Sequence, residues 1–229
     1  MEILGLIRNI KGIIMHQNSQ LIFDHSCLDH FSDGNSVLEI GPRIPSWYKG
    51  QVQNVYPDIN WNYADIDDLG LSLDISSFER TEKIDFVIKD GKYIDVGERK
   101  FDIVFSAQVI EHVPVIWDWV KECARVLKPG GKLVIISPIS WPYHEAPVDC
   151  WRIHPEGMKA LCEYAGLELI FSQAACLEAK GRRIVPGTGR DCQSWKQKLR
   201  YDIAGLFGNQ IEASIDLATV ATKKLPSNS

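Results

Sequence analysis

Short apolar runs recur along the chain, and polar or helix-patterned stretches separate them. The first run, Ser36–Gly41, follows the turn-forming residues Ser32–Asn35 and ends at a glycine, which is typical of a buried strand. The same pattern predicts further strands at Trp61–Ile66, Ile84–Ile88, Phe101–Phe105, Lys132–Ile136, Leu167–Phe171 and Ile215–Thr222. Because strands that alternate with helices are joined by right-handed crossovers, the pattern predicts an α/β fold with a mostly parallel sheet.

Three stretches carry the three-and-four spacing of apolar residues that is typical of an amphipathic helix. They are Met1–Met15, Val115–Leu127 and Pro155–Ala165. Lys128–Gly131 is expected to end the second helix and turn the chain into the next strand, and Gly166 to end the third. We expect the N-terminal helix to cap the core. Peripheral contact with a membrane surface is the alternative, although few basic residues lie on the polar face of this helix.

The chain length and composition predict one domain. The 229 residues, 45% of them hydrophobic, are enough for a sizeable core, and no internal repeat or low-complexity linker divides the chain. Residues 1–31 are expected to form a helical cap, residues 36–178 and 213–224 the core sheet with its helices, and residues 179–212 a basic insertion. No run approaches the roughly 18 apolar residues of a transmembrane segment.

The charge distribution narrows the choice of partners. A formal net charge of −5 argues against a general nucleic-acid binder, which carries a strong basic excess. Bases instead gather in the insertion, opposed by Asp191; they are Lys180, Arg182, Arg183, Arg190, Lys196, Lys198 and Arg200. This loop is either a solvated surface or a site for phosphate. The six cysteines form no Cys-x-x-Cys pair and the N-terminus has no cleavage site, so we expect a cytoplasmic protein with reduced thiols.

The ends of the predicted strands carry the candidate binding residues, because ligands of such sheets bind beyond the carboxyl ends of the strands. Gly41 lets a turn pass close to a ligand, and Glu39 can accept hydrogen bonds. Asp65 ends the second strand, where its carboxylate can hold both hydroxyls of a ribose, with Ile66 as an apolar wall behind it. The two remaining candidate strand ends are Asp90-Gly91 and Ser106–His112.

In this order, the motifs resemble the class I S-adenosylmethionine-dependent methyltransferases of the small-molecule type called methyltransferase domain 11. The resemblance is most specific for Phe101–Val113 followed by Arg125–Leu133. It implies a Rossmann-like α/β fold, in which a seven-stranded, mostly parallel sheet has helices on both faces and an antiparallel last strand. It also implies S-adenosyl-L-methionine as the cofactor. The cofactor-binding residues that it implies are Glu39, Gly41, Pro42, Arg43, Asp65, Ile66, Asp90, Gly91, Ser106 and Gln108.

One motif departs from the pattern of that family. Where Gly-x-Gly-x-Gly is usual in the first loop, Arg43 and Pro45 occupy the second and third glycine positions. A side chain at Arg43 either leaves less room for the methionine moiety or pairs with the cofactor carboxylate. A binding protein that kept the fold and lost catalysis is therefore an alternative. The loop also lacks the Gly-x-Gly-x-x-Gly of a dinucleotide site, and Asp65-Ile66-Asp67 alone is weak support for a glycosyltransferase.

Candidate catalytic residues follow the fifth strand. The segment Ser137–Arg152 combines an imidazole, carboxylates, an arginine and large aromatic residues, which is unusual for a simple connection. His144 is the first choice as general base, because an unperturbed imidazole titrates near pH 6.5. His112 and Asp149 are the other two catalytic candidates, and each also fits a structural role.

A metal site is the alternative use of these residues. Gln108, Glu111, His112 and His144 resemble the ligands of metal-dependent family members that methylate RNA ends or quinone precursors. Gln108 stands where those members have a glutamate, and a neutral amide is a poorer partner for a hard divalent ion. We therefore expect no obligatory metal.

The expected acceptor is a hydroxyl of a small molecule or glycan. Trp141–Gly166 resembles family members found with bacterial glycan and lipopolysaccharide enzymes, and Arg182, Arg183 and Arg190 would suit a phosphorylated acceptor. A nucleic-acid methyltransferase that uses the basic insertion is the alternative, which the overall negative charge disfavours. The oligomeric state is left open.

Overall fold

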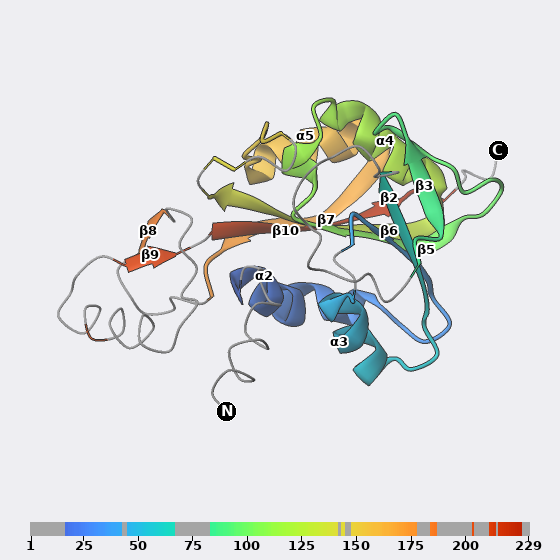
Figure 1. The fold of residues 1–229 in the computed structure, drawn as a ribbon, viewed down its shortest axis with the longest axis horizontal. Helices are drawn as coiled ribbons and strands as arrows, with labels where there is room; N and C mark the ends of the chain where they lie inside the picture. Colours follow the sequence, from blue (N-terminus) through green and yellow to red (C-terminus); the bar gives the residue numbers. More distant parts are fainter. Residues whose placement is uncertain are drawn as a thin grey trace, which may run out of the picture.

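A computed structural model describes residues 17–42, 45–66, 83–141, 143–144, 148–177, 184–186, 203, 211–213 and 215–225. Its central feature is an eight-stranded sheet with the strand order β4-β3-β2-β1-β5-β6-β10-β7 (Figure 1). These strands are β1 (Ser36–Ile40), β2 (Asn60–Ile66), β3 (Phe86–Lys89), β4 (Tyr93–Ile94), β5 (Phe101–Ala107), β6 (Leu127–Ser140), β7 (Leu167–Ala175) and β10 (Ile215–Lys223). A separate parallel pair joins β8 (Ile184–Pro186) to β9 (Ile211–Ala213).

The strand pairing confirms the predicted fold class. β1 pairs in parallel with β2 and β5, and β2 with β3 and β5 with β6 are parallel as well. β10, the last strand, runs antiparallel between β6 and β7. The sheet thus has the seven expected strands and one more, β4, which is too short for a periodic pattern to reveal.

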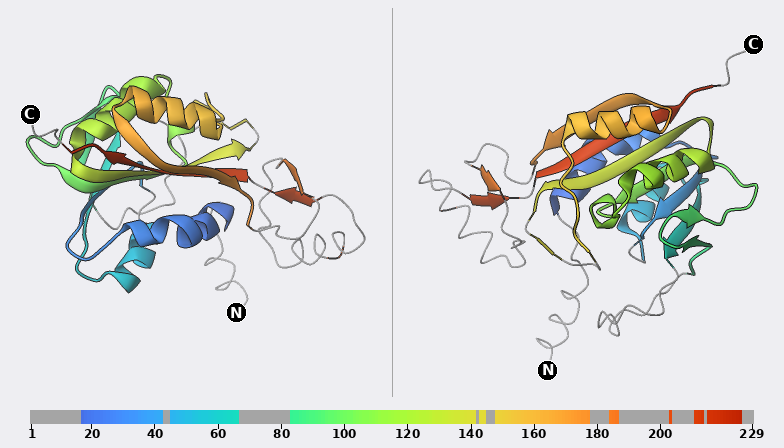
Figure 2. Two further views of the ribbon diagram at one scale, coloured as in Figure 1. Left: turned by 180° about the vertical axis from the view of Figure 1, so that it is seen from behind. Right: turned by 90° about the horizontal axis from the view of Figure 1, so that it is seen from above.

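Helices cover both faces of the sheet (Figures 1 and 2). On one face lie η4 (Ile110–His112), α4 (Ile116–Val126) and α5 (Pro155–Tyr164), which bury Leu38 and Ile40 of β1. On the other lie α2 (Gln17–Ile22), η2 (Phe23–Cys27), η3 (Leu28–His30) and α3 (Trp47–Val55). Side chains alternate along a strand, so Val37 packs on this second face, where Phe23 contacts Phe105 at a ring distance of 5.4 Å.

The connection from α4 to β6 differs from the prediction in one respect. α4 ends at Val126 as expected, but the turn expected at Lys128–Gly131 lies within β6 as an irregularity of the ladder. Phe101 pairs with Leu127, whereas Ile103 pairs with Lys132. The residues in between therefore bulge out of the pairing rather than precede the strand.

Two predicted segments lie largely outside the described residues. The N-terminal helix expected over 1–15 is one of them, and the first described helix is α2, which begins at Gln17. The other is the basic insertion, whose bases from Lys180 to Arg200 all fall outside the described part. Among the helices that the structure describes, none is long and apolar enough to cross a membrane.

Candidate functional site

The turn after β1 passes close to the loop that follows β5. Gly41 has a φ of +65° and its amide donates to the carbonyl of Ala64 at 2.9 Å. A Cβ on Gly41 would lie 2.6 Å from Cγ2 of Val109. Glycine is therefore required here both by the backbone conformation and by the close approach. Pro42 follows it directly, and Arg43 lies outside the described residues.

Glu39, a predicted cofactor ligand, is buried in β1 and accepts hydrogen bonds from other side chains. Its carboxylate accepts from the Ser46 hydroxyl at 3.0 Å and from Nε1 of Trp61 at 2.8 Å. The Ser46 oxygen also caps α3 by accepting from the amide of Lys49 at 3.2 Å. The contacts in the structure tie the β1–α3 loop to the sheet, and a cofactor role for Glu39 remains a prediction.

Asp65 lies where the sequence analysis placed it, near the carboxyl end of β2. β2 is the neighbour of β1, with Ala64 opposite Ile40, so Asp65 and the Gly41 turn share one edge of the sheet. The carboxylate accepts from the amide of Ile66 at 2.8 Å, and the Ile66 side chain is 36% exposed. A carboxylate with an exposed apolar neighbour is the combination expected for a ribose and the ring attached to it.

Asp90 and Gly91 form the tight turn between β3 and β4. Their φ angles are +52° and +63°, and the amide of Lys92 donates to the carbonyl of Lys89 at 3.0 Å. Three residues separate the paired Lys89 and Tyr93, and the first two of them have the positive φ angles that Gly and Asp tolerate in tight turns. Both residues are exposed, and their predicted contact with the cofactor remains a prediction.

The two predicted cofactor residues of the β5 segment are both tied to other elements. The buried Ser106 hydroxyl donates to the carbonyl of Ile40 at 3.3 Å, which links β5 to β1. Gln108 has a φ of +57°, uncommon for a residue with a side chain. Its amide nitrogen donates to the Ser19 hydroxyl and to Oδ1 of Asp216, both at 3.0 Å. These hydrogen bonds hold the Gln108 side chain against α2 and β10.

Asp216 is the centre of a buried polar network that sequence reasoning missed. Its Oδ2 accepts from the amide nitrogen of Asn18 at 2.7 Å and from the Ser19 hydroxyl at 3.3 Å. Asn18 in turn accepts from the amide of Leu177 at 2.6 Å. All three residues Asn18, Ser19 and Asp216 are buried. One signal was available: Asp216 interrupts the apolar pattern of the last strand at the end that pairs with Ser140.

The three predicted catalytic residues are brought together. The rings of His112 and His144 lie 4.9 Å apart, nearly perpendicular. Nδ1 of His144 is 3.4 Å from Oδ2 of Asp149, and Nδ1 of His112 is 2.5 Å from the carbonyl of Val148. Arg152 donates to both oxygens of Asp149, at 2.5 and 2.7 Å. Arg152 and Asp149 therefore form an ion pair within this cluster.

Glu111 joins this cluster as a deeply buried carboxylate. It is 1% exposed, and neither of its oxygens has a hydrogen-bond partner among the described residues. Burial raises the pKa of Glu111 to about 8. In contrast, the hydrogen bond from Arg152 lowers the pKa of Asp149 to about 2. Burial also lowers the pKa of His112, against the opposing effect of its bond to Val148.

Glu111, His112 and His144 offer ligand atoms that all lie within 4.8 Å of one another. Gln108, which the sequence analysis grouped with them, is not part of this arrangement because its side chain bonds to Ser19 and Asp216. The β5–α4 loop connects the two halves of the site: Val109 contacts Gly41, and Glu111 follows two residues later.

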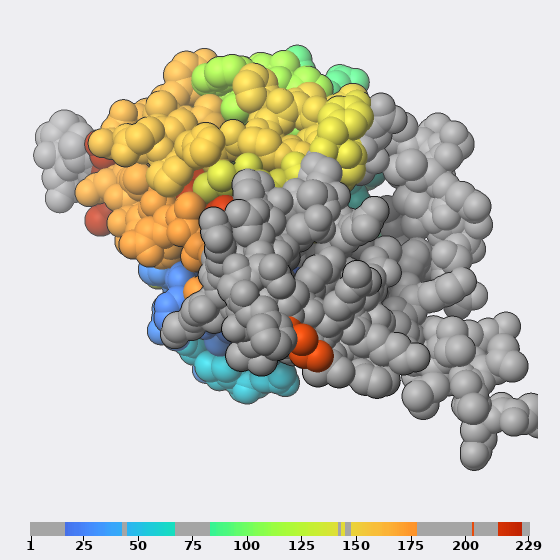
Figure 3. Space-filling view, turned by 90° about the vertical axis from the view of Figure 1, so that its left-hand side faces the viewer, coloured from blue at the N-terminus to red at the C-terminus, as the bar shows by residue number. Residues whose placement is uncertain are grey.

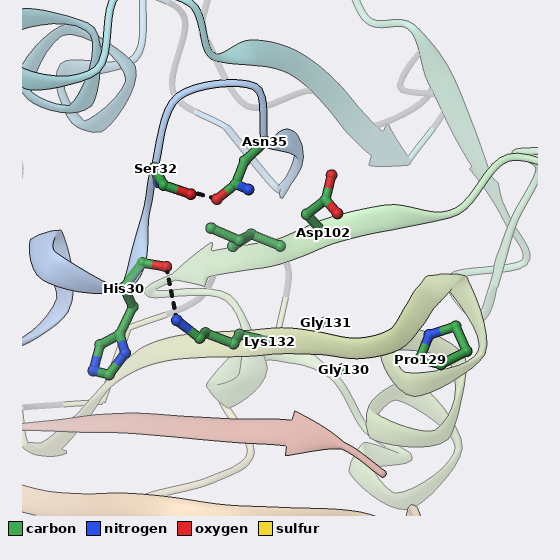
Figure 4. A pocket seen from close by; sticks show the side chains of 9 residues that line it. His30, Ser32, Asn35, Asp102, Pro129, Gly130, Gly131 and Lys132 are labelled. Atoms are coloured by element: carbon green, nitrogen blue, oxygen red, sulfur yellow. Dashed lines mark hydrogen bonds between the residues drawn. The ribbon is translucent and has the colours of Figure 1, made fainter. Parts of the chain in front are cut away.

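A cavity of about 210 Å³ lies at the opposite, amino edge of the strands (Figure 4). Its polar groups bond to one another: Nζ of Lys132 donates to the carbonyl of His30 at 3.2 Å, and the amide of Ser32 donates to Asn35. Asp102 accepts from Lys128 at 2.8 Å. These contacts link the amino ends of the strands. The candidate site lies at the opposite, carboxyl edge of the sheet.

The fold is that of a Rossmann-like α/β protein, and the candidate cofactor-binding residues lie at the carboxyl ends of β1, β2 and β5. A family model described as a methyltransferase domain matches residues 50–135, which begins after the Gly41 turn and includes Asp65, Gln108 and His112. This match supports a class I S-adenosylmethionine-dependent methyltransferase.

Comparisons with individual proteins agree with this assignment. The ubiquinone/menaquinone biosynthesis C-methyltransferase UbiE of Bartonella tribocorum is 24% identical over 162 residues, which cover 57% of this chain and 62% of that protein. The chain thus spans less than two thirds of the length of that relative. A putative sarcosine dimethylglycine methyltransferase from Galdieria sulphuraria has a similar fold, with a TM-score of 0.55, 12% identity and coverage of 90% and 84% of the two chains. Phosphoethanolamine N-methyltransferase 2 of Haemonchus contortus, solved with S-adenosyl-L-methionine, has a TM-score of 0.50, 16% identity and coverage of 91% and 52%.

Proposed function

We propose that the chain binds S-adenosyl-L-methionine at the carboxyl edge of β1, β2 and β5 and methylates a hydroxyl of a small molecule or glycan. The observation that carries the proposal is the pairing of two features at one edge. The turn at Gly41 leaves no room for a side chain, and Asp65 carries a carboxylate on the adjacent strand β2. The family match and a structural relative that holds this cofactor support the same ligand.

The residues at this edge fit the parts of the cofactor. The Asp65 carboxylate would accept hydrogen bonds from the ribose hydroxyls, and the exposed face of Ile66 would lie against the adenine. The Gly41 turn would allow the methionine moiety to approach the backbone. When bound, S-adenosyl-L-methionine supplies a methyl group on a sulfonium sulfur, which leaves with the bonding electrons as a thioether.

The cluster after β5 is the proposed acceptor side. Asp149 lies beside Nδ1 of His144, so it favours a proton on that nitrogen and leaves Nε2 as the acceptor. His144 would then take the proton of the acceptor hydroxyl as its oxygen attacks the methyl carbon. His112, held by the Val148 carbonyl, packs against His144 and limits where its ring can lie.

The acceptor class rests on the surroundings of this cluster. Tyr143, 70% exposed, directly precedes His144, and Trp117, 43% exposed, packs against Trp151, the residue before Arg152. Such flat apolar surface beside polar groups would suit a sugar or a ring that carries a hydroxyl. In the space-filling view of Figure 3, the segment before α5 and α5 itself form a continuous surface beside β7. Two of the proteins named above are a C-methyltransferase and an N-methyltransferase by name, so hydroxyl transfer is a separate proposal for this chain.

Calorimetry with matched variants tests the proposal. S-adenosyl-L-methionine is titrated into the full chain, into Asp65→Ala and into Asp58→Ala, which removes an exposed carboxylate between α3 and β2, outside the site. Loss of two ribose hydrogen bonds predicts binding weakened by about 10- to 100-fold in Asp65→Ala, with Asp58→Ala unchanged. No heat and no thermal stabilisation of the wild type at millimolar ligand would refute the proposal.

A second measurement distinguishes an active methyltransferase from a protein that kept the fold and lost catalysis. Methyl transfer from labelled S-adenosyl-L-methionine to a panel of sugars and phenols is expected for the wild type and lost in His144→Ala. Binding of the cofactor with no transfer to any member of the panel would favour the inactive protein.

A further inference from the structure

We propose that Glu111, His112 and His144 bind a divalent transition-metal ion. The three side chains come from two segments, the η4 turn and the loop after β6, and their ligand atoms lie within 4.8 Å of one another. The inference rests on the proposed function and assigns the acceptor side of that site a chemical role.

The Glu111 carboxylate is the first reason. It is 1% exposed and, within the described part of the chain, no group donates to either of its oxygens. Burial of a carboxylate without a donor is costly, and a cation held between the two imidazoles and the carboxylate would remove this cost. The backbone around it is fixed, because the amide of Cys150 donates to the Glu111 carbonyl at 2.8 Å.

The orientation of the imidazoles is the second reason. Nδ1 of His112 lies 2.5 Å from the Val148 carbonyl, which can only accept a proton, so Nδ1 carries the hydrogen and Nε2 presents a lone pair. This Nε2 lies 3.8 Å from Oε1 of Glu111. Nδ1 of His144 lies 3.4 Å from the Asp149 carboxylate, which favours the same tautomer. Histidines that ligate metals are oriented in this way by a carbonyl or carboxylate behind them.

Asp149 acts as a positioning residue in this site. Arg152 binds both of its oxygens, and the backbone amide of His144 donates to it at 2.9 Å. These contacts leave Asp149 to fix the His144 ring rather than to bind the ion. Arg152 holds Asp149, and Asp149 holds the His144 ring, so the ring is in place before the ion binds.

The donor set indicates the kind of metal. Two imidazole nitrogens and one carboxylate suit borderline ions such as Zn²⁺, Fe²⁺, Co²⁺ or Mn²⁺, whereas Mg²⁺ and Ca²⁺ prefer oxygen ligands throughout. Three protein ligands leave a coordination position for the acceptor oxygen. There the ion would lower the pKa of the hydroxyl, whose proton passes to solvent, and His144 would serve as a ligand instead of a base.

Cobalt spectroscopy of the full chain tests this site without relying on activity. Co²⁺ is added to chelator-treated wild type, Glu111→Gln, His144→Ala and the control His154→Ala, which removes an exposed histidine at the start of α5. The wild type and the control are expected to bind one equivalent with visible ligand-field bands that Zn²⁺ abolishes and excess Mg²⁺ does not. Glu111→Gln and His144→Ala are expected to lose these bands, and circular dichroism checks that each remains folded.

Asp149→Asn adds a readout for the positioning role, with affinity for Co²⁺ expected to fall by about 10- to 100-fold. Absence of the bands in the wild type would overturn the proposal. Equal loss in His154→Ala, or retained binding in both ligand variants, would do the same. Because S-adenosyl-L-methionine binding is measured separately, a protein that binds the cofactor and not Co²⁺ refutes only the metal site.

Discussion

Substitution of Gly41 by alanine probes the turn on which the cofactor site depends. Two costs add up in Gly41→Ala. A φ of +65° costs a residue with a Cβ about 1–2 kcal/mol, and the new Cβ would lie 2.6 Å from Cγ2 of Val109, an overlap of the kind that costs about 1–3 kcal/mol. We therefore expect the free energy of unfolding to fall by about 2–5 kcal/mol.

Gly34 supplies the matched control. Its φ is +76°, and a Cβ there would meet no atom of the described chain within 4 Å. Gly34→Ala should therefore show the backbone cost alone, about 1–2 kcal/mol. In urea unfolding, the difference between the two variants measures the contact with Val109.

A double-mutant cycle isolates that contact. Val109→Ala removes both methyl groups that Gly41→Ala would meet, so the double variant should be more stable than the sum of the single changes predicts, by about 1–3 kcal/mol. Equal losses in Gly41→Ala and Gly34→Ala, together with additive effects in the cycle, would refute the close approach of the two loops.

Two further predictions concern stability. Asp216→Ala removes the acceptor that Asn18, Ser19 and Gln108 share and should lower the free energy of unfolding by about 2–3 kcal/mol in urea; a loss below about 1 kcal/mol would contradict the network. Burial would raise the pKa of Asp102, but its bonds to Lys128 and Ser36 outweigh this effect and lower that pKa. Such a carboxylate stabilises the fold above its unfolded pKa, and the contribution is lost as the pH falls through the lowered folded pKa. Lys128→Met should therefore cost about 0.5–1 kcal/mol at pH 7 for this partly exposed pair and nothing at acidic pH where Asp102 is protonated; a loss that is independent of pH would argue against the ion pair.

The fold was predictable because its signals are local. Runs such as Ser36–Ile40 and Phe101–Ala107 are buried on both faces and bounded by turns, and helix ends such as Gly166, with a φ of +74°, depend on a single residue. The β6 irregularity was not predictable, because the residues Lys128–Gly131 alone predict a turn. Only pairing with Phe101 and Ile103 places it inside the strand.

The site was predictable in part. His112, His144 and Asp149 were identified by residue type and converge in space. The partners of buried polar groups could not be read from the chain, because they are distant in sequence: Asn18 and Asp216 are 198 residues apart. The donors to Glu39 are nearer, since Ser46 and Trp61 are 7 and 22 residues away, but only the packing of the β1–α3 loop and β2 around β1 brings them to its carboxylate.

The role of Glu111 could not be read either. Its adjacent position to His112 suggested a metal ligand only in combination with Gln108, whose side chain bonds elsewhere. What distinguishes Glu111 is its burial and the lack of a hydrogen-bond donor to it in the described region, and both depend on how the loop that carries His144 packs.

Hydrogen–deuterium exchange of the full chain with and without S-adenosyl-L-methionine tests the central claim most directly, since it reports both binding and place. The account predicts slower amide exchange at the ends of β1 and β2, around Gly41 and Asp65, and in the Ser106–His112 segment. Protection confined to the amino edge around His30 and Lys132, or no protection at saturating ligand, would contradict it.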